Sequence, residues 1–199
     1  MNFSETANTG YFFGLVPLLV FLPLTGMLIN MIFGGKMKEW QIGTVASVAS
    51  GLAFVVAVLL VYSLSATHGH AETIFFAEWI YIGDLQLDWT FRVDTLSAVM
   101  MLVVSGVGTL IHIYAIGYMH EDVRFKDDIK RFRRFFVFLN LFIAMMMILV
   151  SGDSYLMLFV GWEGVGLCSF LLIGFWYDFD TLGQKSTANA EAGKKAFIA

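Results

Sequence analysis

The chain has 199 residues, of which 58% are hydrophobic and 14% are charged, and its formal net charge at pH 7 is −4. In a soluble domain about a quarter of the residues are charged, so this composition favours an integral membrane protein. The small negative net charge excludes a surface built for binding nucleic acid. The single cysteine, Cys168, excludes an intramolecular disulfide and a cysteine-based zinc or iron–sulfur site.

Five long apolar runs predict helices that cross a membrane. A ~30 Å hydrocarbon core takes about 20 apolar residues, and lipid offers no hydrogen bonds to a bare backbone, so each run is expected to be helical. Pro17 and Pro23 are expected to bend or loosen the first helix rather than to end it. The fold class predicted is an all-α transmembrane bundle, with the start of a sixth helix near the end of the chain. The five helices are expected over residues 11–33, 41–64, 94–119, 134–152 and 154–177.

The basic residues predict which ends of the helices face the cytoplasm. Two Lys follow the first helix, six Lys or Arg follow the third, and three Lys follow the fifth, whereas Arg92 stands alone among the alternate links. By the positive-inside rule, the basic links face the cytoplasm, and the N-terminus of this multi-pass protein is extracytoplasmic (periplasmic).

The link over residues 65–93 predicts a β-hairpin on the outer face of the membrane. Its second half alternates apolar and polar residues from Leu85 to Val93, its first half is rich in aromatic residues over 73–82, and Gly83-Asp84 between them is a plausible turn. His68 and His70 precede the hairpin, but no further ligand has a spacing that favours a metal site.

The charged segment over residues 120–134 carries apolar residues at helical spacing, namely Phe125, Ile129, Phe132 and Phe136. This pattern favours a solvated helical extension that lies at the cytoplasmic interface. A docking surface for a neighbouring subunit is the alternative.

Glu163 lies in the middle of the fifth apolar run, about 15 Å from its start at ~1.5 Å per residue. A carboxylate near the bilayer midplane costs on the order of 3 kcal/mol, so it calls for a partner, a proton or water. Gly161, Gly164 and Gly166 are expected to remove bulk around it, and Trp162 to add an apolar wall. Glu163 is therefore the candidate for proton translocation, and a carboxyl group that only fixes helix packing is the alternative.

His112 is the other ionisable residue within a predicted span, and imidazole titrates near neutral pH, so a proton relay is possible there. A hydrogen bond between helices is the simpler role. Asn140 is similarly placed but cannot titrate, and Asp94 is expected to be a helix cap or a surface acid. The sequence has no phosphate-binding glycine-rich loop, dinucleotide fingerprint or nucleophile elbow.

The fifth run resembles the signature helix of subunit L, called chain 5 in mitochondria, of proton-pumping NADH:quinone oxidoreductase (respiratory complex I). The residues that carry this resemblance are GWEGVGLCSFLLIGFWY over 161–177, with support from RFFVFLNLFIAMMMILV over 134–150, GVGTLIHIYAIGYM over 106–119, WIYIGDLQLDWTFRVDTLS over 79–97 and KKAFIA over 194–199.

The resemblance implies a membrane-arm subunit that translocates protons while other subunits pass electrons from NADH to quinone. Glu163 matches a buried glutamate that this family pairs with a lysine two helices further on, beyond residue 199. The resemblance also implies that NADH, FMN, iron–sulfur clusters and quinone are bound by other subunits, that this chain binds no cofactor or metal, and that its partners are other membrane-arm subunits, lipid and protons. The chain is then the N-terminal fragment of a longer subunit and inactive alone.

The resemblance also divides the chain into two parts. Residues 1–133 hold the first three helices with the hairpin over 65–93 and the charged loop over 120–133, and residues 134–199 begin the antiporter-like translocating domain. Three alternatives are the related large subunit of multisubunit Na⁺/H⁺ antiporters, a similar subunit of membrane-bound hydrogenases or related quinone oxidoreductases, and a non-catalytic membrane scaffold.

Overall fold

The computed structural model of the chain describes residues 12–83, 85–124, 129–175 and 198. Within these residues, five helices are long and apolar enough to cross a membrane, as the apolar runs predict. In chain order, the elements are the 3₁₀ turn η2 (Phe12–Leu15), α1 (Leu18–Phe33), α2 (Glu39–Ala66), β1 (Glu72–Ile82), β2 (Leu85–Val93), α3 (Thr95–Arg124), α4 (Ile129–Ser151) and α5 (Tyr155–Ile173).

The start of the first span differs from the single helix predicted over 11–33. The chain forms the short turn η2 and then enters α1 after Pro17, which stands immediately before the first helical residue. Proline is tolerated at a helix start because the first N–H groups of a helix have no partner within it, so the break falls where it costs least. Pro23 lies inside α1, which continues past it to Phe33.

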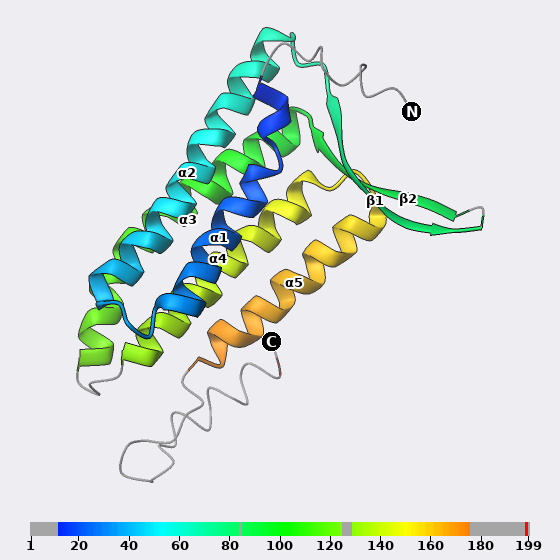
Figure 1. The fold of residues 1–199 in the computed structure, drawn as a ribbon. Helices are drawn as coiled ribbons and strands as arrows, with labels where there is room; N and C mark the ends of the chain where they lie inside the picture. The colour runs from blue at the N-terminus through cyan, green and yellow to red at the C-terminus, as the bar shows by residue number, and fades with distance from the viewer. Residues whose placement is uncertain (1–11, 84, 125–128, 176–197, 199) are drawn as a thin grey trace.

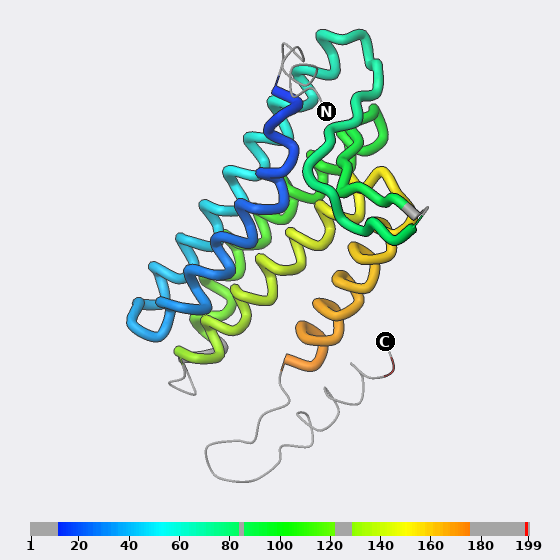
Figure 2. Tube along the Cα trace, turned by 45° about the vertical axis from the view of Figure 1, so that its right-hand side comes forward, coloured from blue at the N-terminus to red at the C-terminus, as the bar shows by residue number. Residues whose placement is uncertain are grey.

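Helices α1 to α4 form the compact part of the bundle, and α5 lies at its edge (Figures 1 and 2). Each of the first four packs against at least two of the others, whereas the extensive helix contacts of α5 within the described chain are with α4 alone. As a result, 17% of the most apolar stretch of α5 is buried, compared with 44% for both α2 and α4. The short link between α4 and α5 makes them antiparallel neighbours.

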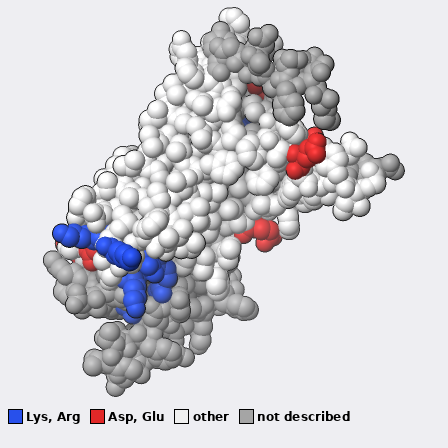
Figure 3. Space-filling view, in the orientation of Figure 1, with Lys and Arg blue, Asp and Glu red and all other residues white. Residues whose placement is uncertain are grey.

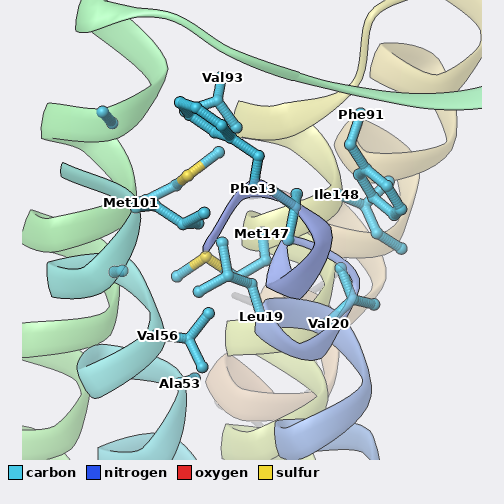
Figure 4. Close-up of a cluster of buried hydrophobic side chains, with 14 of the residues drawn as sticks. Phe13, Leu19, Val20, Ala53, Val56, Phe91, Val93, Met101, Met147 and Ile148 are labelled. Atoms are coloured by element: carbon cyan, nitrogen blue, oxygen red, sulfur yellow. The ribbon is translucent and has the colours of Figure 1, made fainter. Parts of the chain in front are cut away.

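The larger core cluster lies at the end of the bundle where the hairpin joins it. Phe13 of η2 and Phe91 and Val93 of β2 are almost fully buried there, against side chains of α1 to α4 (Figure 4). Lipid tails are as apolar as these side chains, so close van der Waals packing, rather than escape from water, is what holds helices together within the bilayer.

The hairpin predicted over 65–93 is confirmed. β1 and β2 pair antiparallel from Glu72 opposite Val93 to Ile82 opposite Leu85, with two register shifts in β1. The hairpin crosses the end of the bundle and reaches beyond it (Figure 1). Phe91 also forms a bridge with Gly152, and Asp153 N–H donates to the Thr90 carbonyl at 3.3 Å, so β2 is joined to the link between α4 and α5.

The charged segment over 120–134 is helical in its described residues, as predicted, but two of its apolar residues are packed in the bundle and not solvated. Its first residues extend α3 to Arg124, and its last residues begin α4 at Ile129, while 125–128, and with them Phe125, lie outside the described residues. Phe132 and Phe136 are fully buried in a second core cluster with residues of α2 and α3. The segment extends the bundle because its apolar residues at helical spacing find a partner in the ends of α2 and α3.

Lys and Arg gather at one end of the bundle (Figure 3). Lys36 and Lys38 precede α2, and the first turns of α4 carry four more basic residues, which together define the basic end. Arg92 lies at the opposite end, called here the hairpin end. The helices thus bring together the basic links that the sequence predicts to lie on one side of the membrane. The assignment of that side to the cytoplasm stays a prediction.

Candidate functional site

Glu163 is the ninth residue of the 19 in α5, so it lies at the middle of a helix that is just long enough to span the hydrocarbon core. Its side chain is exposed on the outer face of α5, away from the bundle. No hydrogen bond or ion pair joins it to any other described residue. Large apolar side chains share this exposed side of the helix: Phe159, Trp162, Leu167 and Phe170.

The glycines around Glu163 do not all act as predicted. A Cβ on Gly161 would lie 2.6 Å from the backbone of Leu149, and a Cβ on Gly164 would lie 2.4 Å from the sulfur of Met145, so both glycines let α5 approach α4. Only Gly166 has open space beside it within the described chain. These two glycines allow a close helix approach, but it lies on the face of α5 turned away from the carboxylate.

His112 is fully buried and joins α3 to α4. Its Nδ1 lies 2.7 Å from the Gly108 carbonyl oxygen one turn earlier, and its Nε2 lies 3.0 Å from Oδ1 of Asn140. The ring of Phe136 packs beside the imidazole, with 6.3 Å between ring centroids. The hydrogen bond between helices that the sequence suggests is therefore present, and Asn140, which cannot titrate itself, is its partner.

Other buried polar groups lie on the inner faces of the helices α1 to α4. Ser50 on α2 and Thr109 on α3 are joined by a hydrogen bond of 3.1 Å between their hydroxyl groups. On α1, Asn30 is fully buried and its Nδ2 donates to the carbonyl of Ile42 at 3.1 Å. Sequence reasoning did not single out Asn30; the available signal was an amide within an apolar run.

The structure does not bring Glu163 and His112 together. Helices α3 and α5 both pack on α4 and share no extensive contact with each other. His112 lies on the inner side of α4, within the four-helix bundle, and Glu163 lies on the outer side of α5. Within the described chain, Glu163 and His112 are therefore two separate ionisable groups on membrane-spanning helices.

At the hairpin end, Asp94 caps α3 as predicted. Its carboxylate accepts the backbone N–H of Ser97 at 2.8 Å, and Ser97 Oγ accepts the backbone N–H of Asp94 at 2.8 Å. The hydrogen bond from the Ser97 backbone, with further support from Arg92, holds the pKa of Asp94 below its usual value. Nearby on the hairpin, a hydrogen bond with the Asp88 carboxylate raises the pKa of the exposed Tyr81 to about 12.

At the basic end, His120 on α3 contacts Glu39 at the start of α2, with 2.6 Å between Nδ1 and Oε2. Both residues line an open groove of about 550 Å³ with Lys38 and Trp40. Sequence reasoning missed this pair because 81 residues separate its members. Among the described residues, no three His, Cys, Asp or Glu side chains are grouped as a metal site would need.

The family model for the chain 5 N-terminus of NADH–ubiquinone oxidoreductase (complex I) matches residues 79–136. The matched stretch runs from the middle of β1 through α3 into the first turns of α4. It includes His112 and ends before Asn140 and Glu163.

Curated relatives extend the similarity to most of the chain. The NADH-quinone oxidoreductase subunit L of Mycobacterium tuberculosis (strain CDC 1551 / Oshkosh) is 45% identical over 183 residues, which are 91% of this chain and 26% of that protein. The subunit L of Pseudomonas aeruginosa is 39% identical over 186 residues, 92% of this chain and 28% of that protein. The NADH-ubiquinone oxidoreductase chain 5 of Aspergillus niger is 37% identical over 168 residues, 84% of this chain and 24% of that protein.

The chain thus spans about a quarter of the length of the curated relatives it matches. Their names agree with one another, with the description of the family model and with the resemblance carried by the fifth helix. The protein is a multi-pass membrane protein that belongs to the subunit L (chain 5) family of NADH-quinone oxidoreductase, the family of membrane-arm subunits of complex I.

Proposed function

We propose that this chain is part of a subunit that translocates protons across the membrane, coupled to electron transfer from NADH to quinone elsewhere in its complex. The observation that carries the proposal is the position of Glu163, a carboxyl group at the middle of a spanning helix, on a face that no described helix covers. A carboxylate facing lipid at this depth is costly, so the face is expected to meet protein or water in the assembled subunit.

Glu163 is the residue to which we assign the proton. A carboxyl group beside a basic group favours the ionised form, and the same group in an apolar setting favours the protonated form. Alternation between two such surroundings makes Glu163 take up and release a proton. We expect the basic partner of Glu163 in the part of the relatives' length that this chain does not span.

His112 is a second protonatable group, to which we assign a supporting role as a proton relay. Its burial between α3 and α4 and its paired ring nitrogens keep it within the bundle and well oriented. Imidazole exchanges protons near neutral pH, which suits the working range of a membrane pump.

The remaining parts of the proposal concern partners and placement. The redox cofactors NADH, FMN, iron–sulfur clusters and quinone are expected on other subunits, and the neighbours of this chain are expected to be lipid and other membrane-arm subunits. The basic end is expected to face the cytoplasm and the hairpin end the periplasm. The division that we propose places helices one to three in 1–133 and the beginning of a translocating domain in 134–199, and this boundary falls within the first turns of α4.

The test is Glu163→Gln in the full-length subunit, assembled in its complex. Protons pumped per NADH oxidised are measured in membrane vesicles, with Glu78→Gln as the matched control because Glu78 is an exposed acid on the hairpin. The expected result is a complex that assembles and oxidises NADH but pumps fewer protons, while the control pumps normally.

Two other results would contradict the proposal. Assembly and unchanged pumping with Glu163→Gln would indicate a residue that only fixes packing, as in a scaffold. Transport that depends on Na⁺ and not on NADH oxidation would indicate an antiporter subunit instead.

A further inference from the structure

Three buried polar side chains lie on the packed helices α1, α3 and α4. They are His112, Asn140 and Asn30, each fully buried. Every one of them lies in a membrane-spanning helix, where an unsatisfied polar group is costly.

The carbonyl of Gly108 can only accept a hydrogen bond, so Nδ1 of His112 carries a proton and donates it there. The opposite ring nitrogen, Nε2, faces Oδ1 of Asn140, which also only accepts. With the Asn140 amide in this orientation, both ring nitrogens carry a proton. A neutral ring would instead need the amide of Asn140 to turn, so that Nδ2–H donates to the bare Nε2.

The other half of the Asn140 amide points toward α1. Its Nδ2 has no hydrogen-bond partner among the described residues and lies 3.0 Å from the position that a Cβ on Gly26 would take. One turn further along α1, Oδ1 of Asn30 also has no partner in the described chain. Side chains on a helix lean toward its N-terminus, so Asn30 leans back toward Gly26 and Asn140. An unpaired donor and an unpaired acceptor thus lie on the same face of α1.

Charged groups on the packed helices are far from this contact. Helix α1 carries none, and α2 carries only Glu39 at its first residue. On α3, His120, Glu121, Asp122 and Arg124 follow His112 by two turns or more, and on α4 the charged residues, Lys130, Arg131, Arg133 and Arg134, lie nearly two turns or more before Asn140. The hydrogen bonds of its two ring nitrogens are therefore the nearest polar contacts of His112 among the described residues.

We propose that Asn140 is a positioning residue that couples the protonation of His112 to α1, through one buried water that bridges Asn140 Nδ2 and Asn30 Oδ1. When Nε2 is protonated, Oδ1 of Asn140 accepts from it and Nδ2 donates to the water, which in turn donates to Asn30. When Nε2 releases its proton to water, the amide turns, Nδ2 donates to the ring, and the bridging water donates to both amide oxygens, so its hydrogen bond with Asn140 reverses direction. A water with two such partners fits the usual environment of buried water.

This inference rests on the proposed role in proton translocation, and it makes the pH dependence of pumping the quantity to measure. In the full-length subunit within its complex, protons pumped per NADH oxidised are followed from acid to alkaline pH. Asn140→Leu removes the acceptor that favours a protonated Nε2, so pumping should fail at a lower pH than in the wild type. Asn140→Asp should have the opposite effect and extend pumping to higher pH than in the wild type, because a carboxylate beside Nε2–H favours the protonated imidazole more than a neutral amide does.

Ser50→Ala is the matched control, since it removes another buried hydrogen bond between helices without touching His112, and it should leave the pH profile in place. An unchanged profile in Asn140→Leu would overturn the inference. If Glu163→Gln in the same assay still stops pumping, the proposed function stands without it.

A second measurement does not depend on activity or on the folding of a variant. A structure of the wild-type complex at a resolution that shows ordered water should place one water within hydrogen-bond distance of both Asn140 and Asn30. A dry contact between these amides would overturn the inference, even if pumping itself is confirmed.

Discussion

Glu163 and Gly161 are two residues apart on α5 and face opposite ways, because successive residues of an α-helix are turned by about 100°. Gly161 is buried against α4, where its missing side chain lets two backbones approach, and Glu163 is exposed on the outer face. The two residues of one short motif therefore have separate roles, and substitutions at each should affect different properties.

Gly161→Ala should weaken the packing of α5 on α4. The added Cβ would lie 2.6 Å from the Leu149 backbone, which cannot move aside as a flexible side chain can. Overpacking of this kind costs about 1–3 kcal/mol. The measurement is thermal unfolding of the purified complex in detergent. Gly166→Ala is the control, because nothing lies within 4 Å of its new Cβ among the described residues; equal losses in both variants would contradict this account of α5.

Asp94→Ala should lower the stability of the hairpin end at neutral pH by about 1 kcal/mol, the usual effect of losing a helix cap. Because the Ser97 backbone holds the pKa of Asp94 below its ordinary value of about 3.9, the ionised cap stabilises the fold above that value. This stability is lost as pH falls through the lowered pKa of the folded state. Thermal midpoints of wild type and variant should therefore differ at pH 7 and converge at strongly acid pH. A difference that persists there would contradict the assignment.

At the scale of elements, the helices and the hairpin could be predicted because their signals are local. An apolar run of spanning length indicates a helix, and the alternation from Leu85 to Val93 indicates a strand. The break before Pro17 and the continuation of α4 through Phe132 could not be predicted in the same way. Both depend on which partner surface is present, and hydropathy along the chain does not carry that information.

The candidate site likewise contains one residue that the sequence alone reveals and others that only the packing of the helices reveals. Glu163 could be found from the sequence because a carboxyl group inside an apolar run stands out whatever the fold of the protein. The pairing of His112 with Asn140 and the place of Asn30 depend on how α3, α4 and α1 meet across the bundle. Residues 28 positions apart give no local sign of that contact.

Phe91→Ala should loosen the hairpin from the bundle. Phe91 is 1% exposed, within the core shown in Figure 4, and its removal from a core costs about 3–5 kcal/mol. The expected result is faster proteolytic cleavage near Gly83, between the two strands. Phe75→Ala serves as the control, since Phe75 lies on the same hairpin and is 50% exposed. Equal cleavage of both variants would show that Phe91 does not anchor the hairpin.

At the scale of the whole molecule, the charges are divided between two ends. The basic end holds Lys36, Lys38 and the basic first turns of α4, and the hairpin end holds Arg92 with the acids Asp94 and Asp153 as ion-pair partners. Translocation of Lys and Arg across a membrane is disfavoured, so this division predicts one orientation of the bundle.

Single cysteines introduced at the two ends should report that orientation. In intact cells, a membrane-impermeant thiol reagent should label Ile82→Cys on the exposed hairpin and should not label Lys36→Cys. In inverted vesicles, the pattern should reverse. Both variants carry Cys168→Ser, so that the native thiol gives no background. Labelling of Lys36→Cys in intact cells would place the basic end outside and contradict the predicted orientation.

The central claim is that Glu163 changes its protonation while the complex turns over. The most direct measurement is the infrared absorption of protonated carboxyl groups in the complete complex, recorded as the difference between resting membranes and membranes oxidising NADH. This account predicts a carboxyl band that changes during turnover in the wild type and is missing from the Glu163→Gln difference spectrum. Identical spectra for the two would contradict a proton-carrying role for Glu163.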